Sequence, residues 1–110
     1  MEGFFRGTGF DWDEGNARKN WVRHRVSQEE CEQVFANEPF RVYEDRKHSA
    51  IERRYYVLGR TDSGRRLAVI CTHRGGLIRV ISARDMSRRE RLKYERTRQE
   101  APETDSEVQV

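Results

Sequence analysis

Two arginines in the second half of the chain are suited to phosphate chemistry. Arg79 lies within the apolar, β-branched run LIRVISA, residues 77–83, and Arg84 follows it directly. The planar guanidinium of arginine donates paired hydrogen bonds to phosphate oxygens and stays charged. Because a buried guanidinium without a partner is costly, each must meet an anionic ligand or pair with a carboxylate. The candidate carboxylates are Asp45, Glu52 and Glu90.

Strand geometry limits how these two arginines could cooperate. Strict alternation places residues 79 and 84 on opposite faces of a strand. They can therefore act together only if Arg84 lies beyond the strand end, where the chain turns into a helix.

A basic helix is predicted immediately after this strand. Ser87 and Glu90 have the spacing of a capping box, which predicts a helix start at Arg88. The helix carries a dense set of cations: Arg88, Arg89, Arg91, Lys93, Arg96 and Arg98. We interpret them as a solvated face, or as a surface for nucleic acid or an acidic partner. Arg88 and Arg91, with Arg74 at a predicted turn, are candidates for nucleic-acid phosphate contacts.

Proton transfer requires other groups. His48 lies three residues after Asp45 in a polar stretch, and imidazole titrates near neutral pH, so His48 is a candidate general acid or base. The alternative is a solvated loop histidine. Tyr94 on the basic helix stacks on a base, donates a proton, or belongs to the core. No cysteine and histidine spacing fits zinc, and Asp45 with His48 is a weak metal pair, so we expect no metal and no cofactor.

The composition indicates a single small basic domain. The chain has 110 residues and a formal charge of +3. Residues 100–110 contain four acids and no base, so the other 99 residues carry +7. Such a surface suits nucleic acid, an anionic membrane or acidic proteins. Cys31 and Cys71 lie in apolar stretches, which predicts reduced core thiols in a cytosolic protein. No run has the length of a membrane span.

The remaining pattern predicts the elements that would position these residues. We expect a short edge strand near 10–12, helices over 14–24 and 28–36, strands over 40–44, 53–60, 66–73 and 77–83, and the basic helix from residue 88. The strand connections are short, which favours antiparallel neighbours. The expected fold class is α+β, with the helices grouped on one face of a four-stranded antiparallel sheet.

Three segments and one helix face complete this prediction. We expect a loose N-terminus over 1–9, a folded domain over 10–99 and a disordered acidic tail over 100–110. In the first helix, Ala17 and Trp21 are expected on the apolar face, with Asn16 and Asn20 beside it.

The ordered set of motifs resembles the BrnT family of bacterial toxin-antitoxin ribonucleases. The segment FDWDEGNARKNWVRHRVSQEECEQVF, residues 10–35, is similar to the opening of that family. Later positions also match: Asp45, His48, Glu52, Arg53, Gly59, Arg60, Gly64, Arg66, Thr72, Arg74, the run IRVISAR over 78–84, Glu90, Arg91 and Tyr94.

This chain departs from the family pattern at two positions. Arg25 stands where the family usually has glycine, at the expected end of the first helix, and a left-handed backbone there costs a non-glycine residue about 1 kcal/mol. Cys31 replaces a small residue. Neither departure removes a charged group.

The resemblance implies a compact RelE-like fold and cleavage of RNA that arrests translation. Arg79, Arg84, His48 and Tyr94 are then the candidate catalytic residues, and Arg74, Arg88 and Arg91 the RNA contacts. It also implies a small BrnA-type antitoxin, with a ribbon-helix-helix region that binds operator DNA. The alternative is a catalytically inactive module of the same fold that binds nucleic acid or the antitoxin.

Overall fold

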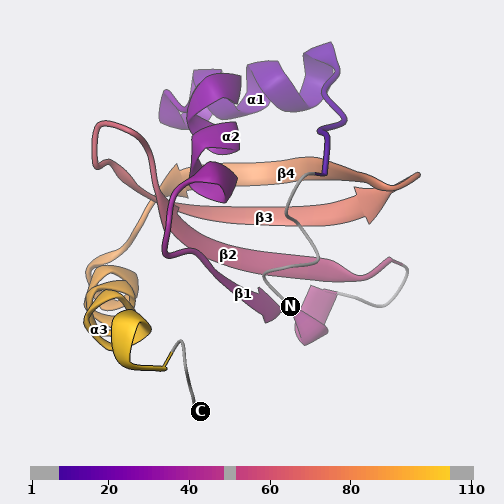
Figure 1. The fold of residues 1–110 in the computed structure, drawn as a ribbon. Coiled ribbons are helices and arrows are strands. Elements are labelled where there is room, and N and C mark those ends of the chain that lie inside the picture. The colour runs from indigo at the N-terminus through magenta and orange to yellow at the C-terminus, as the bar shows by residue number, and fades with distance from the viewer. Residues whose placement is uncertain (1–7, 49–51, 105–110) are drawn as a thin grey trace.

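The computed structural model describes residues 8–48 and 52–104, with side chains described over 8–47 and 52–96. Two helices come first: α1 (Glu14–His24) and α2 (Gln28–Ala36). Strand β1 (Arg41–Glu44), the short 3₁₀ helix η2 (Arg46–His48), and strands β2 (Arg54–Arg60), β3 (Arg66–Arg74) and β4 (Leu77–Asp85) follow, then helix α3 (Arg88–Thr104). The strands form one antiparallel sheet in the order β1-β2-β3-β4 (Figure 1). The predicted α+β class and four-stranded sheet are confirmed.

Each α-helix begins at a reciprocal capping box, and the predicted box of Ser87 and Glu90 is confirmed. Asp13 and Asn16 close the box of α1, and Ser27 and Glu30 that of α2. At α3, the Ser87 backbone N–H donates to Glu90 Oε1 over 2.8 Å. The Glu90 backbone N–H donates to the Ser87 hydroxyl over 3.2 Å. These side chains satisfy backbone donors that a helix start leaves unpaired.

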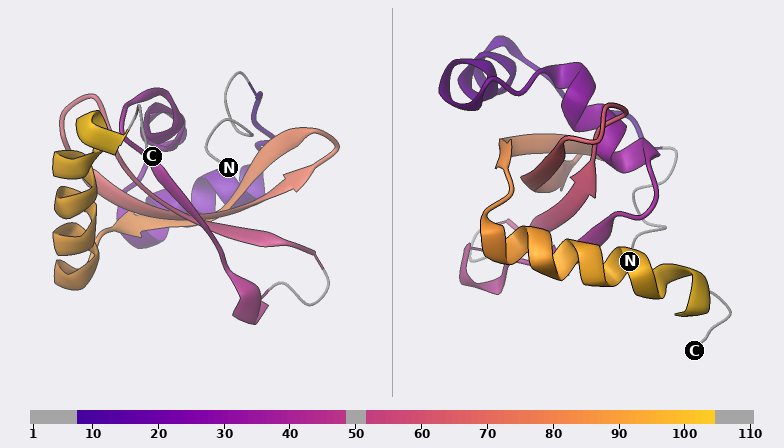
Figure 2. Two further views of the ribbon diagram at one scale, coloured as in Figure 1. Left: turned by 60° about the horizontal axis from the view of Figure 1, so that its bottom comes forward. Right: turned by 90° about the vertical axis from the view of Figure 1, so that its left-hand side faces the viewer.

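The helices do not share one face of the sheet, so that expectation is wrong. α1 and α2 lie over one face, and α3 packs on the opposite side (Figure 2). Strand β2 explains this arrangement because it has buried apolar side chains on both of its faces. Tyr55 and Val57 pack in the large core cluster under α2, while Leu58 packs with Tyr94 of α3 on the other face. Alternation alone could not tell which of these two apolar faces α3 would cover.

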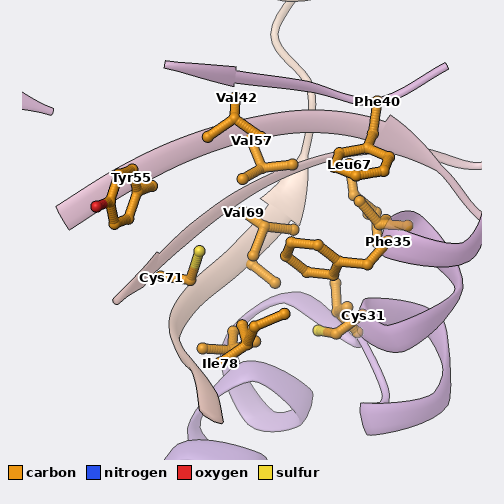
Figure 3. Packing of buried hydrophobic residues seen from close by; sticks show 14 residues of the cluster. Cys31, Phe35, Phe40, Val42, Tyr55, Val57, Leu67, Val69, Cys71 and Ile78 are labelled. Carbon is orange, nitrogen blue, oxygen red and sulfur yellow. The ribbon is translucent and has the colours of Figure 1, made fainter. Parts of the chain in front are cut away.

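The larger core is filled by side chains that converge from β2, β3, β4 and α2. Val57, Val69 and Ile78 meet Phe35 and Cys31 in its interior (Figure 3). Gly59 is required here, because a Cβ at that position would lie 2.6 Å from the Val34 side chain. The sheet and α2 therefore approach more closely than any other residue would allow.

Both cysteines are free and buried, as predicted. Burial raises the pKa of each thiol to about 12. Neither sulfur is therefore a nucleophile near neutral pH.

The expected N-terminal strand is reduced to one parallel bridge between Phe10 and Ile78. The Asp11 N–H donates to the Ile78 carbonyl over 2.8 Å, and the Ile78 N–H donates to the Gly9 carbonyl over 2.9 Å. Asp13 then caps α1, so the chain leaves the sheet edge after a single pairing. A short segment of this kind covers part of the exposed β4 edge.

Helix α1 docks through polar rather than apolar side chains. Asn16 and Asn20 are its buried residues, whereas Trp21 is 48% exposed, so the predicted Ala17 and Trp21 face is wrong. Asn16 Nδ2 donates to the Val80 carbonyl over 3.0 Å, and Asn20 Oδ1 accepts from the Ala83 N–H over 3.0 Å. Because β4 is an edge strand, these amides satisfy backbone groups that no strand pairs.

The C-terminal boundary differs from the expectation. Helix α3 runs through Thr104, so it overlaps the first residues of the segment expected to be disordered from residue 100. Glu100 and Ala101 are good helix formers, which favours this continuation, whereas Pro102 opposes it. Residues 105–110 of the expected tail, and residues 1–7 of the expected loose N-terminus, lie outside the described part of the chain.

Candidate functional site

The sheet face opposite α1 and α2 carries seven arginines, which we call the strand-arginine face. Paired residues of neighbouring strands point to the same side of a sheet, so the register identifies the members. Leu58 and Ala68 of the smaller core define this side, and Arg41 and Arg84 pair directly with them. By register and alternation the face comprises Arg41, Arg54, Arg60, Arg66, Arg74, Arg79 and Arg84.

A β-bulge places Arg79 and Arg84 on this same face. The register of β3 and β4 shifts between Ile70 and Cys71, so that β4 contains one extra residue. The expectation that Arg84 must lie beyond the strand to join Arg79 is therefore wrong, because Arg84 lies within β4. The bulge reverses the alternation between the two positions.

Arg84 is oriented by a carboxylate of α3. Its two terminal nitrogens donate to the Glu90 carboxylate oxygens over 2.7 and 3.0 Å, and its side chain remains 41% exposed. The Tyr56 hydroxyl also donates to Glu90 Oε2. The Arg84 guanidinium and these hydrogen bonds lower the pKa of Glu90 to about 2, although partial burial opposes them. Burial and the ionised Glu90 raise the pKa of Tyr56 above its ordinary value.

Arg79 is engaged by the start of α1. One nitrogen donates to Asp13 Oδ2 over 2.8 Å, Asp11 Oδ2 lies 3.6 Å from the other, and the side chain is only 17% exposed. The hydrogen bond from Arg79, after that from the Asn16 N–H, lowers the pKa of Asp13. Arg79 thus fastens the capping carboxylate of α1 to the edge of the sheet.

A hollow of about 500 Å³ lies where β4 ends and α3 begins. Its lining includes Arg65, Arg66 and Arg91, with the carboxylates of Asp85 and Glu95. Arg65 is held firmly: it contacts Asp85 Oδ1 over 2.7 Å and Glu30 Oε1 over 3.1 Å, and donates to two carbonyls at the end of α1. Arg66 donates to Glu95. Arg91 is exposed, so it is available to an anionic ligand at this hollow.

The predicted site residues fall into two groups rather than one. Arg74 is 55% exposed and lies 3.6 Å from Glu52, at the end of β3 remote from α3. Arg74 lies six positions along β3 from Ala68, the partner of Arg84, a span of about 20 Å. His48 ends η2, which follows the same remote end of β1, and its side chain lies outside the described part. His48 and Arg84 are therefore not positioned to contact one phosphate.

Two other predicted residues lie in the core and on an exposed side of α3, respectively. Tyr94 is fully buried and its hydroxyl donates to the Pro39 carbonyl over 2.7 Å, which matches the core alternative. Arg88 is exposed on the side of α3 that carries Leu92.

Sequence reasoning missed Tyr56, and it gave Glu90 only the role of a capping residue and an ion-pair alternative. The alternation of residues 53–60 places Arg54, Tyr56 and Arg60 on one face of β2, which was a usable signal. Which carboxylate would reach Arg84 depended on the side of the sheet that α3 covers.

Within the described residues, no group of three or more His, Cys, Asp or Glu side chains could hold a metal ion. No helix there is long and apolar enough to cross a membrane.

Comparisons with known proteins agree with this fold. A search of solved structures found a similar fold in the 1.1 Å crystal structure of the Brucella abortus ribonuclease toxin, BrnT. The TM-score is 0.52 and the identity 23%, over 74% of this chain and 99% of that one. A search of curated proteins gave no match. A family model described as "Ribonuclease toxin, BrnT, of type II toxin-antitoxin system" matches residues 12–90. Because this match covers well over half of the sequence, the chain belongs to the BrnT family of ribonuclease toxins of type II toxin-antitoxin systems.

Proposed function

We propose that the protein is an endoribonuclease that cleaves RNA without a metal ion, with Arg84 at the reacting phosphate. The strand-arginine face carries this proposal, because its Arg84 is oriented by Glu90 yet remains 41% exposed. When a ribose 2′-hydroxyl attacks phosphorus, negative charge gathers on the nonbridging oxygens. A guanidinium already fixed in place stabilises that charge without reorganising.

The other residues have separate roles in this proposal. Arg74, at the end of the face remote from α3, and Arg91, on α3, are both exposed and hold the RNA chain on either side of Arg84. Arg79 and Tyr94 have enclosed side chains and serve the fold. His48 is too remote along the sheet to exchange a proton at a phosphate bound by Arg84, so we do not assign it that step.

We further propose that a small BrnA-like antitoxin, encoded beside this gene, binds the protein and holds it inactive in the cytoplasm. Membership in a type II toxin-antitoxin family supports a protein antitoxin. A ribbon-helix-helix region in that partner would connect the complex to operator DNA, which this chain then contacts only indirectly.

The test is RNA cleavage by purified protein in excess chelator. We expect the wild type to cleave, and the product to carry a 2′,3′-cyclic phosphate. A single 2′-deoxy substitution at the cleaved nucleotide should block the reaction. Arg84→Ala should lower the rate at least about 100-fold, with a loss in unfolding free energy of no more than about 2 kcal/mol. The matched control is Arg18→Ala, at an exposed arginine of α1.

Two results would contradict the proposal in different ways. Cleavage that stops in chelator and returns with added divalent metal would mean a metal-dependent enzyme. Intact RNA together with a salt-sensitive mobility shift would favour a noncatalytic binding module of the same fold.

A further inference from the structure

The side of α3 turned away from the sheet combines cations with an exposed apolar residue. Arg88, Arg89, Leu92, Lys93 and Arg96 line a shallow hollow of about 630 Å³ there. Leu92 is 63% exposed. The spacing of 88, 92 and 96 forms one row along the helix, and 89 and 93 form the row beside it. We call this set the outer α3 surface.

The acidic residues of this helix segment lie on its other side. Glu90 is bound by Arg84 and Glu95 by Arg66, both from the sheet. Two carboxylates that could have balanced the helix cations are therefore used in holding α3 to the sheet. Among the side chains described over 88–96, the outer α3 surface carries positive charge only.

An exposed leucine amid cations fits a protein partner better than RNA. Covering an aliphatic side chain removes apolar surface from water, and phosphates cannot supply that cover. RNA readers instead present aromatic rings on which bases stack. The ring of Tyr43 on β1 already has the Lys93 ammonium over it, 3.9 Å from the ring centroid. Figure 2 shows α3 beside the sheet with its far side uncovered by any other described helix or strand.

We propose that the outer α3 surface binds an acidic amphipathic segment of the antitoxin, with an apolar side chain seated on Leu92 and carboxylates on the surrounding cations. The identity of this partner rests on the proposed function. Charge complementarity selects the occupant, because four cations in two rows match acidic residues spaced along one face of a helix. The surface is distinct from the strand-arginine face, so the segment binds without contacting Arg84.

The experiment measures binding of the purified antitoxin, encoded beside this gene, by isothermal titration calorimetry. Arg89→Glu with Arg96→Glu should weaken binding at least about 100-fold. Leu92→Ala should weaken it about 10-fold. The matched control, Lys19→Glu with Arg23→Glu on exposed positions of α1, makes the same change in net charge and should stay within about threefold of wild type.

RNA cleavage by each free variant separates the outcomes. The proposal requires Arg89→Glu with Arg96→Glu to retain cleavage within about threefold of wild type. Wild-type affinity for the antitoxin in that variant would overturn the proposal. A loss of RNA cleavage greater than about tenfold in it would assign the surface to RNA and also overturn the proposal.

The test also covers a variant that fails to fold and a wild type that cleaves no RNA. If the reversed pair fails to fold, Arg89→Gln with Arg96→Gln replaces it, with about tenfold weaker antitoxin binding expected and wild-type affinity again counting against the proposal. If wild-type protein cleaves no RNA, the proposed function fails, while the binding comparison still decides the role of the outer α3 surface.

Discussion

Glu90 has the most connected side chain of the first turn of α3. It accepts hydrogen bonds from Arg84, Tyr56 and the Ser87 N–H, so one carboxylate caps the helix and fixes it to the sheet. A carboxylate this well supplied with donors stays ionised to low pH, which is why its pKa is about 2.

This pKa predicts a pH-dependent contribution to stability. The folded-state pKa lies below the ordinary 4.5, so the unfolded chain binds more protons, and the contribution is present above about pH 5 and lost as pH falls toward 2. Glu90→Gln should lower the unfolding free energy by about 2 kcal/mol at pH 7. Urea unfolding of both proteins from pH 7 to pH 3 should show that the difference shrinks. An equal difference at both ends of the range would contradict the prediction.

Arg25 is a second residue whose conformation has a measurable cost. It ends α1 with φ 55° and ψ 41°, the left-handed backbone that glycine adopts without strain. The unusual arginine at this family position is therefore held in the conformation predicted for glycine.

Arg25→Gly should raise the unfolding free energy by about 0.5 kcal/mol. The relief of about 1 kcal/mol is reduced because the guanidinium lies 5.3 Å from the Trp21 ring centroid, a contact that glycine loses. Arg25→Ala loses that contact and keeps most of the strain, so it should destabilise the protein. Chemical denaturation of the three proteins tests the order glycine, arginine, alanine, and a less stable glycine variant would refute it.

At the scale of elements, α1 replaces a missing neighbouring strand. It contributes amides to the backbone of β4 near the bulge, through Asn16 and Asn20. Its outward side therefore keeps Trp21 and Val22, which are 48% and 60% exposed. A helix attached in this way depends on hydrogen bonds that water does not reach.

Asn20→Ala should therefore be costly for a substitution on a polar helix. Asn20 is 1% exposed, and its loss leaves the Ala83 N–H buried without that acceptor. We expect a loss of about 2 to 3 kcal/mol in unfolding free energy. The neighbouring exposed Lys19→Ala serves as the control and should change it by less than about 0.5 kcal/mol. Equal losses from the two variants in urea titrations would show that the amide does not anchor α1.

Elements with local signals were predictable from the sequence. The spacing of Ser87 and Glu90 located the start of α3, and the strands followed from alternation and turn residues. The bulge in β4 was not predictable, because it arises from pairing with β3 and has no local signature. The side of the sheet that α3 covers was also not predictable, since β2 has buried apolar side chains on both faces. The partner of Arg84 and the burial of Tyr94 followed from that placement.

At the scale of the molecule, carboxylates pair with arginines of the strand-arginine face, whereas the described side chains of the outer α3 surface carry positive charge only. Ion pairs with Glu52, Glu90 and Glu95 hold three strand arginines. Because a guanidinium has five N–H donors, one bidentate contact leaves other donors available to a ligand. These carboxylates therefore orient the strand-arginine face rather than abolish its attraction for phosphates. Electrostatic binding of this kind releases counterions from RNA and weakens as salt rises.

The salt dependence of RNA binding tests the contribution of Arg74 to this electrostatic attraction. It is 55% exposed and about 20 Å along β3 from the position of Arg84, so we expect it to contact RNA backbone away from the reacting phosphate. Arg74→Ala should reduce the slope of log affinity against log salt by about 0.7, the value for one phosphate contact on a single strand. The measurement is fluorescence anisotropy with a 2′-deoxy-substituted RNA that resists cleavage, using exposed Arg23→Ala on α1 as control. An unchanged slope for Arg74→Ala, or an equal reduction for Arg23→Ala, would mean that RNA does not extend along the sheet toward the end of β3.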